Sequence, residues 1–355
     1  MHNPGMRSIF IKVPIVAVSF SALCCLAIPC AGQDNLSLLG RQEIDCPVCE
    51  QAFTTLICTQ TNTRGGVDRD LLARALGPQP VFFEISTCPR CAYSGYIGDF
   101  KPDVELSQAF KDKLLKAPKL ALPDDFTPDS DPRMLDAADR YRLAITCYTW
   151  RERSDEALAW LHLRASWVAR DTGAMLPPDD RLARVLVFSE RWRPEMEPGD
   201  NQADIELRLA TRLAEMSAIG RFNRYQRPYV ELTLLLILRR HGENLQAEPM
   251  VERLMKTDSF SDVIQRSLRD MKASIDLERD HQRQALTHFK QALAGKQVEE
   301  ANIPSACYLV GELSRRLGED AVAIEWFDRV IADEHTDPQL RRWAQQQRST
   351  CTPKS

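Results

Sequence analysis

Two Cys-Pro-x-Cys pairs give the clearest chemical signal in this chain. They lie at residues 46–49 and 88–91. A Cys-x-x-Cys turn can direct two sulfur atoms at one ion, so two such turns can supply the four thiolates of a tetrahedral zinc site. Four protein ligands leave no open position for a substrate, so this zinc ion would be structural. We therefore predict one zinc ion bound by Cys46, Cys49, Cys88 and Cys91.

Disulfide bonds and thiol–disulfide exchange are the alternatives to zinc. An exported chain can meet an oxidising compartment, and two pairs allow three disulfide connectivities. A bridge within one Cys-x-x-Cys pair closes a small ring that is easily reduced. A thioredoxin-like site would place one pair at a helix start after a strand, whereas Cys46 follows a polar stretch. Cys58 is a fifth candidate ligand, which we interpret as a small buried apolar residue.

The first 32 residues have the pattern of a secretory signal peptide. Arg7 and Lys12 precede an apolar run from Val13 to Pro29, and small residues follow before the chain turns polar. That is the order of regions in a cleaved export signal. The run is of marginal length for a membrane-spanning helix, so an uncleaved N-terminal anchor is the alternative. We predict an exported protein, periplasmic or extracellular.

Composition and motifs narrow the classes of function. The chain has 355 residues, a net charge of −4 and no dense Lys/Arg stripe, so we expect no nucleic-acid partner. A basic-aromatic cluster at residues 221–227 is interpreted as a solvated helix end or loop rather than a phosphate site. The metalloprotease, nucleophile-elbow and P-loop motifs are all missing, so we predict no enzyme. His281 and His288 could share a solvated or hydrogen-bonded helix face.

The segment before the helical part divides into a module and a linker. Residues 33–100 hold the four cysteines, with a helix expected at Asp68–Leu76 and a strand at Val81–Thr87 that leads into the second pair, as in a zinc ribbon. Residues 101–132 are rich in Pro and Asp and predict a linker with one short helix within Val104–Lys116. The module is therefore expected to be a small α+β unit.

Residues 133–355 predict helices that repeat. Ala285, Phe289 and Ala292 follow a spacing that recurs 38 residues later and 38 residues earlier. A small residue lets two helices approach closely and a larger one fills the gap, so each set is expected on the second helix of a pair. One pair cannot bury its apolar face alone, so pairs stack into an α-solenoid. The concave face would be lined by residues 228–241, 260–278 and 303–316.

This helical pattern resembles the tetratricopeptide repeat family. The signature positions are occupied by Gly311, Gly318, Ala323 and Phe327, and Pro338 lies near the place of the closing proline. The resemblance implies helix pairs that bind an extended peptide or another protein. The fold class that we predict is mainly α, a C-terminal α-solenoid of tetratricopeptide-like helix pairs preceded by a small zinc-ribbon-like module.

The N-terminal module resembles the bacterial family named domain of unknown function 2225. Residues 44–49 read Ile-Asp-Cys-Pro-Val-Cys, and residues 84–96 read Glu-Ile-Ser-Thr-Cys-Pro-Arg-Cys-Ala-Tyr-Ser-Gly-Tyr. Members pair two such knuckles and continue into helical sequence. The chain departs from the pattern at Glu50 and Ala92, where knuckles prefer Gly for a left-handed turn under the metal. The resemblance implies a metal-binding, repeat-containing protein and no reaction.

The function expected from these patterns is a non-catalytic exported scaffold. It would bind a protein or peptide through the tetratricopeptide-like surface, and its zinc module would cap or orient the helices. Membrane contact is expected only through an uncleaved N-terminal segment. The alternative is an envelope thiol–disulfide protein that uses the Cys-x-x-Cys pairs.

Overall fold

A computed structural model describes residues 36–117, 122–173, 176, 180–196, 202–258 and 260–352. The predicted signal peptide lies outside the described residues. The described part is mainly helical, as predicted, with two small antiparallel sheets. The helices are α1 (Gln108–Lys116), α2 (Ala137–Trp150), α3 (Asp155–Gly173), α4 (Asp180–Ser189), α5 (Gln202–Ala218), α6 (Arg227–Arg240), α7 (Asn244–Leu254), α8 (Asp262–Ala294), α9 (Ile303–Arg316), α10 (Asp320–Ala332) and α11 (Pro338–Thr350).

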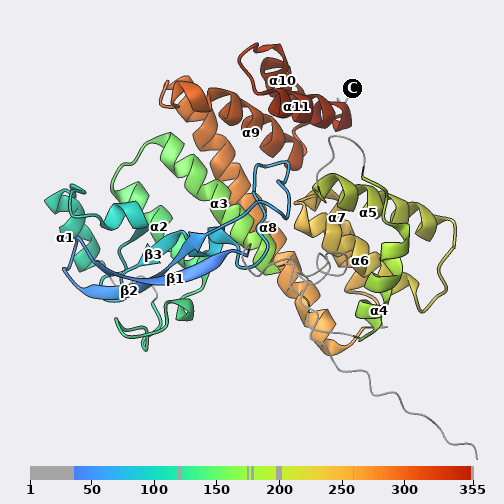
Figure 1. The fold of residues 1–355 in the computed structure, drawn as a ribbon, viewed down its shortest axis with the longest axis horizontal. Coiled ribbons are helices and arrows are strands. Elements are labelled where there is room, and N and C mark those ends of the chain that lie inside the picture. Colours follow the sequence, from blue (N-terminus) through green and yellow to red (C-terminus); the bar gives the residue numbers. More distant parts are fainter. Residues whose placement is uncertain are drawn as a thin grey trace, which may run out of the picture.

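Helix α8 runs through the middle of the molecule and is flanked by three groups of elements (Figure 1). The strands lie on one side with α1 and α2, helices α4–α7 lie on the other side, and α9–α11 lie at one end. Helix α3 packs along α8. A Cβ placed on Gly173 of α3 would come within 1.7 Å of the Ser274 hydroxyl, so glycine permits the close approach of these two helices.

The strands form two hairpins. β1 (Leu38–Asp45) pairs antiparallel with β2 (Ala52–Gln60), and β3 (Ile85–Thr87) pairs antiparallel with β4 (Ser94–Tyr96). The predicted strand at 81–87 is shorter than expected, because Pro80–Phe83 forms a 3-10 helix and only the last three residues are extended. The predicted helix within 104–116 is confirmed as α1.

The predicted helix at 68–76 is wrong. Residues 64–76 form a loop with turns and one isolated bridge between Val67 and Ala73. Gly66 and Leu71 adopt positive φ, 87° and 69°, which a helix does not allow. Asp68, Asp70 and Arg74 of this loop are buried among the helices, and these contacts override the weak local helix signal.

One of the three predicted helix pairs is wrong. The expected first helix at 260–278 and the helix that carries Ala285, Phe289 and Ala292 are a single helix, α8. No Gly or Pro interrupts residues 262–294, so nothing stops the helix. Its first half packs into an apolar core with α4–α7, and its second half packs into another core with α2, α3 and α9.

The other two predicted pairs are helical hairpins. Helices α6 and α7 turn at Gly242 and helices α9 and α10 turn at Gly318, with φ of 72° and 81°. Glycine takes this conformation without a Cβ penalty, so it ends the first helix of each pair. A Cβ on Gly311 of α9 would lie 2.8 Å from the Phe327 ring of α10, so this contact needs the smallest residue.

The predicted groove-lining helices α6 and α9 are central to the fold. In α6, residues 229, 230 and 232–239 are all buried, and in α9 residues 308–314 are all buried. The expectation that these two helices line an open concave face is therefore wrong, because α4, α5 and α7 pack against α6, and α8, α10 and α11 pack against α9. Among the described helices, none is both long enough and apolar enough to cross a membrane.

Candidate metal centre

Each cysteine pair lies at the turn of a hairpin, the first between β1 and β2 and the second between β3 and β4. In the first turn the amide of Cys46 donates to the carbonyl of Gln51 at 3.0 Å, and the amide of Glu50 donates to the carbonyl of Cys46 at 2.9 Å. The second turn has the same two hydrogen bonds. The amide of Cys88 donates to the carbonyl of Tyr93 at 2.8 Å, and the amide of Ala92 donates to the carbonyl of Cys88 at 2.9 Å. Two equivalent turns therefore present their sulfur atoms in the same way.

The residue after each pair adopts the left-handed conformation that the turn requires. Glu50 has a φ of 60° and Ala92 a φ of 61°. These are the two positions at which the sequence carries a side chain where glycine is preferred. The turns therefore form despite the Cβ atoms, at a cost of about 1–2 kcal/mol at each position.

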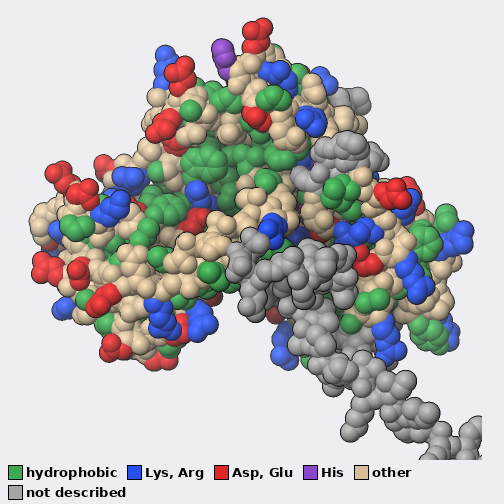
Figure 2. All heavy atoms as spheres, in the orientation of Figure 1, with side chains coloured by type: hydrophobic (Ala, Val, Ile, Leu, Met, Phe, Trp, Pro, Cys, Tyr) green, Lys and Arg blue, Asp and Glu red, His purple; other side chains and the backbone are tan. Residues whose placement is uncertain are grey.

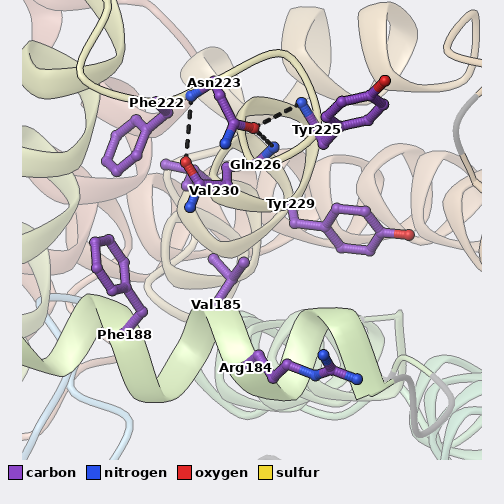
Figure 3. Close-up of a pocket in the computed structure, with 9 residues that line it drawn as sticks. All are labelled: Arg184, Val185, Phe188, Phe222, Asn223, Tyr225, Gln226, Tyr229 and Val230. Atoms are coloured by element: carbon purple, nitrogen blue, oxygen red, sulfur yellow. Dashed lines mark hydrogen bonds between the residues drawn. The ribbon is translucent and has the colours of Figure 1, made fainter.

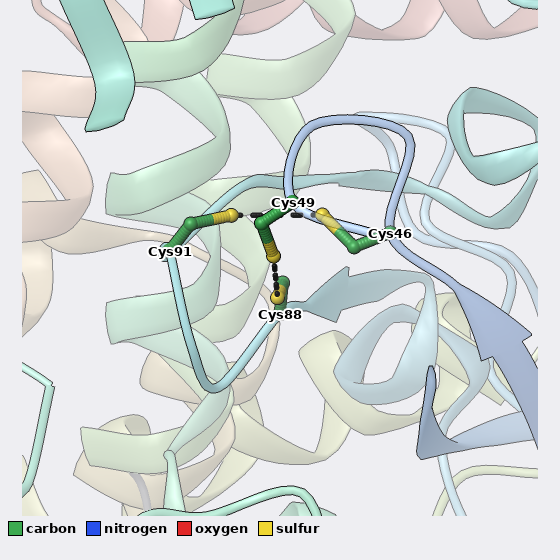
Figure 4. A group of neighbouring side chains, drawn as sticks. All are labelled: Cys46, Cys49, Cys88 and Cys91. Carbon is green, nitrogen blue, oxygen red and sulfur yellow. Dashed lines mark hydrogen bonds between the residues drawn. The ribbon is translucent and has the colours of Figure 1, made fainter. Parts of the chain in front are cut away.

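The four predicted ligands meet at one point, with the sulfur atoms turned toward one another (Figure 4). The Cys46 and Cys91 sulfurs are 3.5 Å apart, those of Cys49 and Cys88 are 3.6 Å apart, and all four lie within 4.8 Å of one another. A tetrahedral ion with zinc–sulfur bonds of about 2.3 Å places its ligands about 3.8 Å apart. The set fits such an ion, whereas a disulfide needs about 2.05 Å, and all four cysteines are free.

The charge state of this cluster favours a cation. Hydrogen bonds among the four sulfurs lower the pKa of Cys49 and Cys88 and raise the pKa of Cys46 and Cys91. Four neighbouring thiolates would repel one another unless a cation lay between them. A divalent cation would allow all four to ionise.

Apolar side chains surround the cysteines and hold the two hairpins together. The rings of Tyr93 and Phe100 lie 5.1 Å apart, and the rings of Phe53 and Phe110 pack against them at 5.7 and 5.9 Å. Cys147 of α2 lies beneath the second turn, where its sulfur accepts a hydrogen bond from the amide of Ser94 at 3.4 Å. This contact connects the metal centre to the helices.

A family model described as "Uncharacterized protein conserved in bacteria (DUF2225)" matches residues 39–275 and 271–351. The chain belongs to the DUF2225 family. No curated protein and no solved structure matches it.

In this DUF2225 protein, Cys58 is not part of the four-cysteine group. It lies on β2, where its thiol donates to the carbonyl of Gln60 at 3.1 Å.

The DUF2225 chain also contains a buried group of ion pairs that sequence reasoning missed, here called the charge cluster. Among the described residues it joins seven carboxylates with six guanidinium groups and His241. Its members come from the 64–76 loop, α3, α5, α6, the turn after α6, α8 and α9. They are Asp68, Asp70, Asp171, Glu206, Glu243, Glu278, Glu312, Arg74, Arg170, Arg239, Arg240, Arg315, Arg316 and His241.

Asp70 and Arg170 lie at the centre of the charge cluster. One Asp70 carboxylate oxygen accepts from Arg170 at 2.5 Å, from Arg316 at 2.9 Å and from the Trp167 indole at 2.9 Å. Arg170 also donates to Glu278 at 2.8 Å. The side chains of these two acids and two arginines have no exposed surface. A substrate therefore cannot reach them in this conformation, and the cluster acts by holding the loop to the helices.

His241 balances the charge of the cluster. It lies 2.9 Å from Asp68 and 2.8 Å from Glu206. Burial alone would lower the pKa of His241, but the Asp68 carboxylate and the contact with Glu206 outweigh it and raise the pKa above its ordinary value. With His241 protonated, seven positive groups face seven carboxylates.

One signal for the charge cluster was available in the sequence: Arg239-Arg240 and Arg315-Arg316 occupy the same place before the two glycine turns.

His281 and His288 share a face of α8, as predicted, and both meet His162 of α3. The Nδ1 atoms of His162 and His281 are 3.1 Å apart, and the rings of His162 and His288 stack at 5.7 Å. His288 also contacts Asp155 at 2.8 Å. Burial, together with the charges of the two neighbouring histidines, lowers the pKa of His162 to about 3. The ring of His162 therefore packs as a neutral imidazole at pH 7.

Proposed function

We propose that this DUF2225 protein is a non-catalytic exported scaffold whose N-terminal module is closed by one structural zinc ion. The observation that carries the proposal is the spacing of the Cys46, Cys49, Cys88 and Cys91 sulfurs. Zinc would be held by four thiolates with no open position, so it would supply folding energy and no reaction. Export is proposed from the signal pattern of residues 1–32.

We further propose that the helical part binds a protein or peptide as tetratricopeptide-like proteins do. Two hairpins, α6–α7 and α9–α10, support this proposal, since each has a glycine turn and a fully buried small residue, Ala247 or Ala323, on its second helix. Because α6 and α9 are buried, the partner would contact surfaces outside them. The continuous helix α8 makes the array different from a regular stack of pairs.

The test is elemental analysis of the purified mature chain, with counting of reactive thiols on the same sample. We expect about one zinc ion per chain and four thiols that react only after a chelator removes the metal. Two disulfides and no metal would overturn the proposal and favour thiol exchange. Rapid alkylation of one cysteine at neutral pH would point the same way.

Single substitutions make this test specific. Cys88→Ser should abolish zinc binding and loosen residues 44–60 and 85–96, because three thiolates cannot close the site. Cys58→Ser is the matched control and should keep the metal, since this cysteine lies outside the group. Retained helical circular dichroism in Cys88→Ser is expected if the module is a separate unit. Loss of the helices with the metal would contradict that division.

A further inference from the structure

A cavity of about 630 Å³ lies between α4 and the start of α6, in the lobe opposite the cysteines. Its walls are formed mainly by apolar and aromatic side chains of α4, of the loop before α6, and of α6. A cavity of this size and lining is in the range that small ligands occupy. Residues 222, 223, 225 and 226 of the basic-aromatic segment 221–227 line it, so the interpretation of this segment as a solvated loop is incomplete.

The cavity has one apolar end and one polar end (Figure 3). Phe188 and Phe222 face each other at one end, with their ring centroids 6.4 Å apart. The polar ends of Arg184, Tyr225 and Tyr229 extend toward the opposite side of the view. A bound molecule would therefore have an apolar body and a single polar head.

The polar end carries positive charge and donors that are not used elsewhere. Among the described residues, Arg184 has no hydrogen bond or ion pair. Tyr229 is only 4% exposed, and its hydroxyl has no hydrogen-bond partner within the described part of the chain. The Tyr225 hydroxyl accepts from Arg224, whose guanidinium also lies 4.6 Å from the Tyr225 ring. A carboxylate at this end could accept from Arg184 and Tyr229, and Tyr225 still has its own proton to donate.

The surrounding charge favours an anion. The protein has a net charge of −4, yet Figure 2 shows several Lys and Arg side chains over the α4–α7 lobe, with acidic side chains among them. Arg191 packs over the Phe188 ring at 5.6 Å and adds to the positive rim. Arg184 and Arg191 therefore favour an anionic ligand at this cavity.

The lining is poorly suited to a peptide backbone. The side-chain oxygen of Asn223 accepts from the amides of Tyr225 and Gln226 at 3.0 Å, and the oxygen of Gln226 accepts from the amide of Asn223 at 3.2 Å. These two amide side chains therefore shape the loop, and a buried peptide would leave its own amides without partners. A hydrocarbon body has no such groups.

We propose that this cavity binds a monocarboxylate with a hydrocarbon chain, such as a fatty acid. The chain packs against Phe188 and Phe222, which meet edge to face in the cavity wall, and the carboxylate accepts hydrogen bonds from Arg184 and Tyr229. The inference does not depend on the zinc module, because the cavity lies in a different lobe. It adds a small-molecule ligand to the proposed scaffold.

The experiment is isothermal titration of the full-length protein with dodecanoate. We expect one site with an affinity in the micromolar range. Methyl dodecanoate and dodecyltrimethylammonium have the same chain with a neutral or a positive head, and both should bind at least tenfold more weakly. Arg184→Gln should weaken dodecanoate binding tenfold or more, since a charge-assisted hydrogen bond is lost.

Arg221→Gln is the matched control. This exposed arginine lies in the loop before α6, beside residues that line the cavity, but does not line it itself. It should bind dodecanoate as the natural protein does. Val185→Trp fills the cavity from α4 and should abolish binding of all three probes. No binding of dodecanoate to the natural protein, equal binding to Arg184→Gln, or tighter binding of the apolar peptide acetyl-Leu-Leu-Phe-amide would overturn the proposal.

Discussion

The metal centre and the charge cluster are both buried and polar, and both involve the N-terminal hundred residues, but they are built differently. The four cysteines come from two hairpin turns, and each pair is positioned by hydrogen bonds that span at most five residues. The charge cluster joins Asp70 to Arg316, which are 246 residues apart, and draws on five helices. A local turn can form its half of a site alone, whereas the cluster can form only when the helices have packed.

The two sites therefore hold different parts of the molecule in place. The hairpins close around the cysteines and contact the helices through Cys147 of α2. The 64–76 loop, which lies between the two hairpins in sequence, is anchored to α3, to the end of α6 and to α9. If the four cysteines hold the proposed zinc ion, its loss should therefore loosen the hairpins, and loss of a cluster charge should loosen the whole helical assembly.

The largest effect is expected from Asp70→Asn. The substitution keeps the shape of the side chain but leaves Arg170 and Arg316 buried without this carboxylate. Breaking one partner of a buried ion pair costs about 3–5 kcal/mol. Urea denaturation followed by helical circular dichroism should show this loss as a single shifted transition.

Asp139→Asn is the control for that measurement. Asp139 pairs with Arg142 on α2 at 2.9 Å, with side chains that are 43% and 46% exposed. Loss of this exposed pair should change the unfolding free energy by less than about 1 kcal/mol. A cost for Asp70→Asn as small as that of Asp139→Asn would mean that the charge cluster does not anchor the loop.

A smaller, pH-dependent effect is expected at His162, on the same α3–α8 seam as the charge cluster. The folded-state pKa of about 3 lies below the ordinary value of 6.5, so the unfolded chain binds the proton more readily between these two pH values. The neutral ring of His162 makes its full contribution to stability above pH 6.5. As the pH falls from 6.5 toward 3, the free energy of unfolding decreases by about 1.4 kcal/mol for each pH unit.

The measurement is urea denaturation at pH 6.5 and pH 5. His162→Gln should lose about 2 kcal/mol less than the natural protein over this interval. His335→Gln removes an exposed histidine and should follow the natural protein. Equal pH dependence in all three proteins would show that protonation of His162 does not oppose folding at this seam.

The smallest effect concerns the metal centre. Glu50→Gly removes the Cβ from a residue with a φ of 60°, so the first turn should become more stable by up to about 1 kcal/mol. Glu43→Gly is the control, because Glu43 lies in the extended strand β1 opposite Thr54. It should destabilise the hairpin by about 0.5–1 kcal/mol. Equal losses in both variants would mean that the left-handed turn carries no strain.

The cysteine site could be predicted from the sequence because its information is local. Two Cys-x-x-Cys turns can point their sulfurs at one ion whatever the rest of the chain does, so the four cysteines that the structure brings together could be named without knowledge of the fold. The mainly helical class and the glycine turns at Gly242 and Gly318 could be predicted for the same reason. The 38-residue spacing predicted a helix pair where the structure has the single helix α8. Equal spacing of buried residues does not require a turn between them.

The charge cluster and the cavity depend on tertiary packing. Asp68 and Asp70 look like ordinary solvated acids in the sequence, and only the convergence of α3, the turn after α6, and α9 gives them buried partners. The segment 68–76 is not helical, although its sequence predicts a helix. Its buried ion pairs outweigh a helix propensity worth a few tenths of a kcal/mol per residue. Arg184 and Tyr229 likewise lie far apart in the sequence, and packing of α4 beside α6 brings them to one cavity.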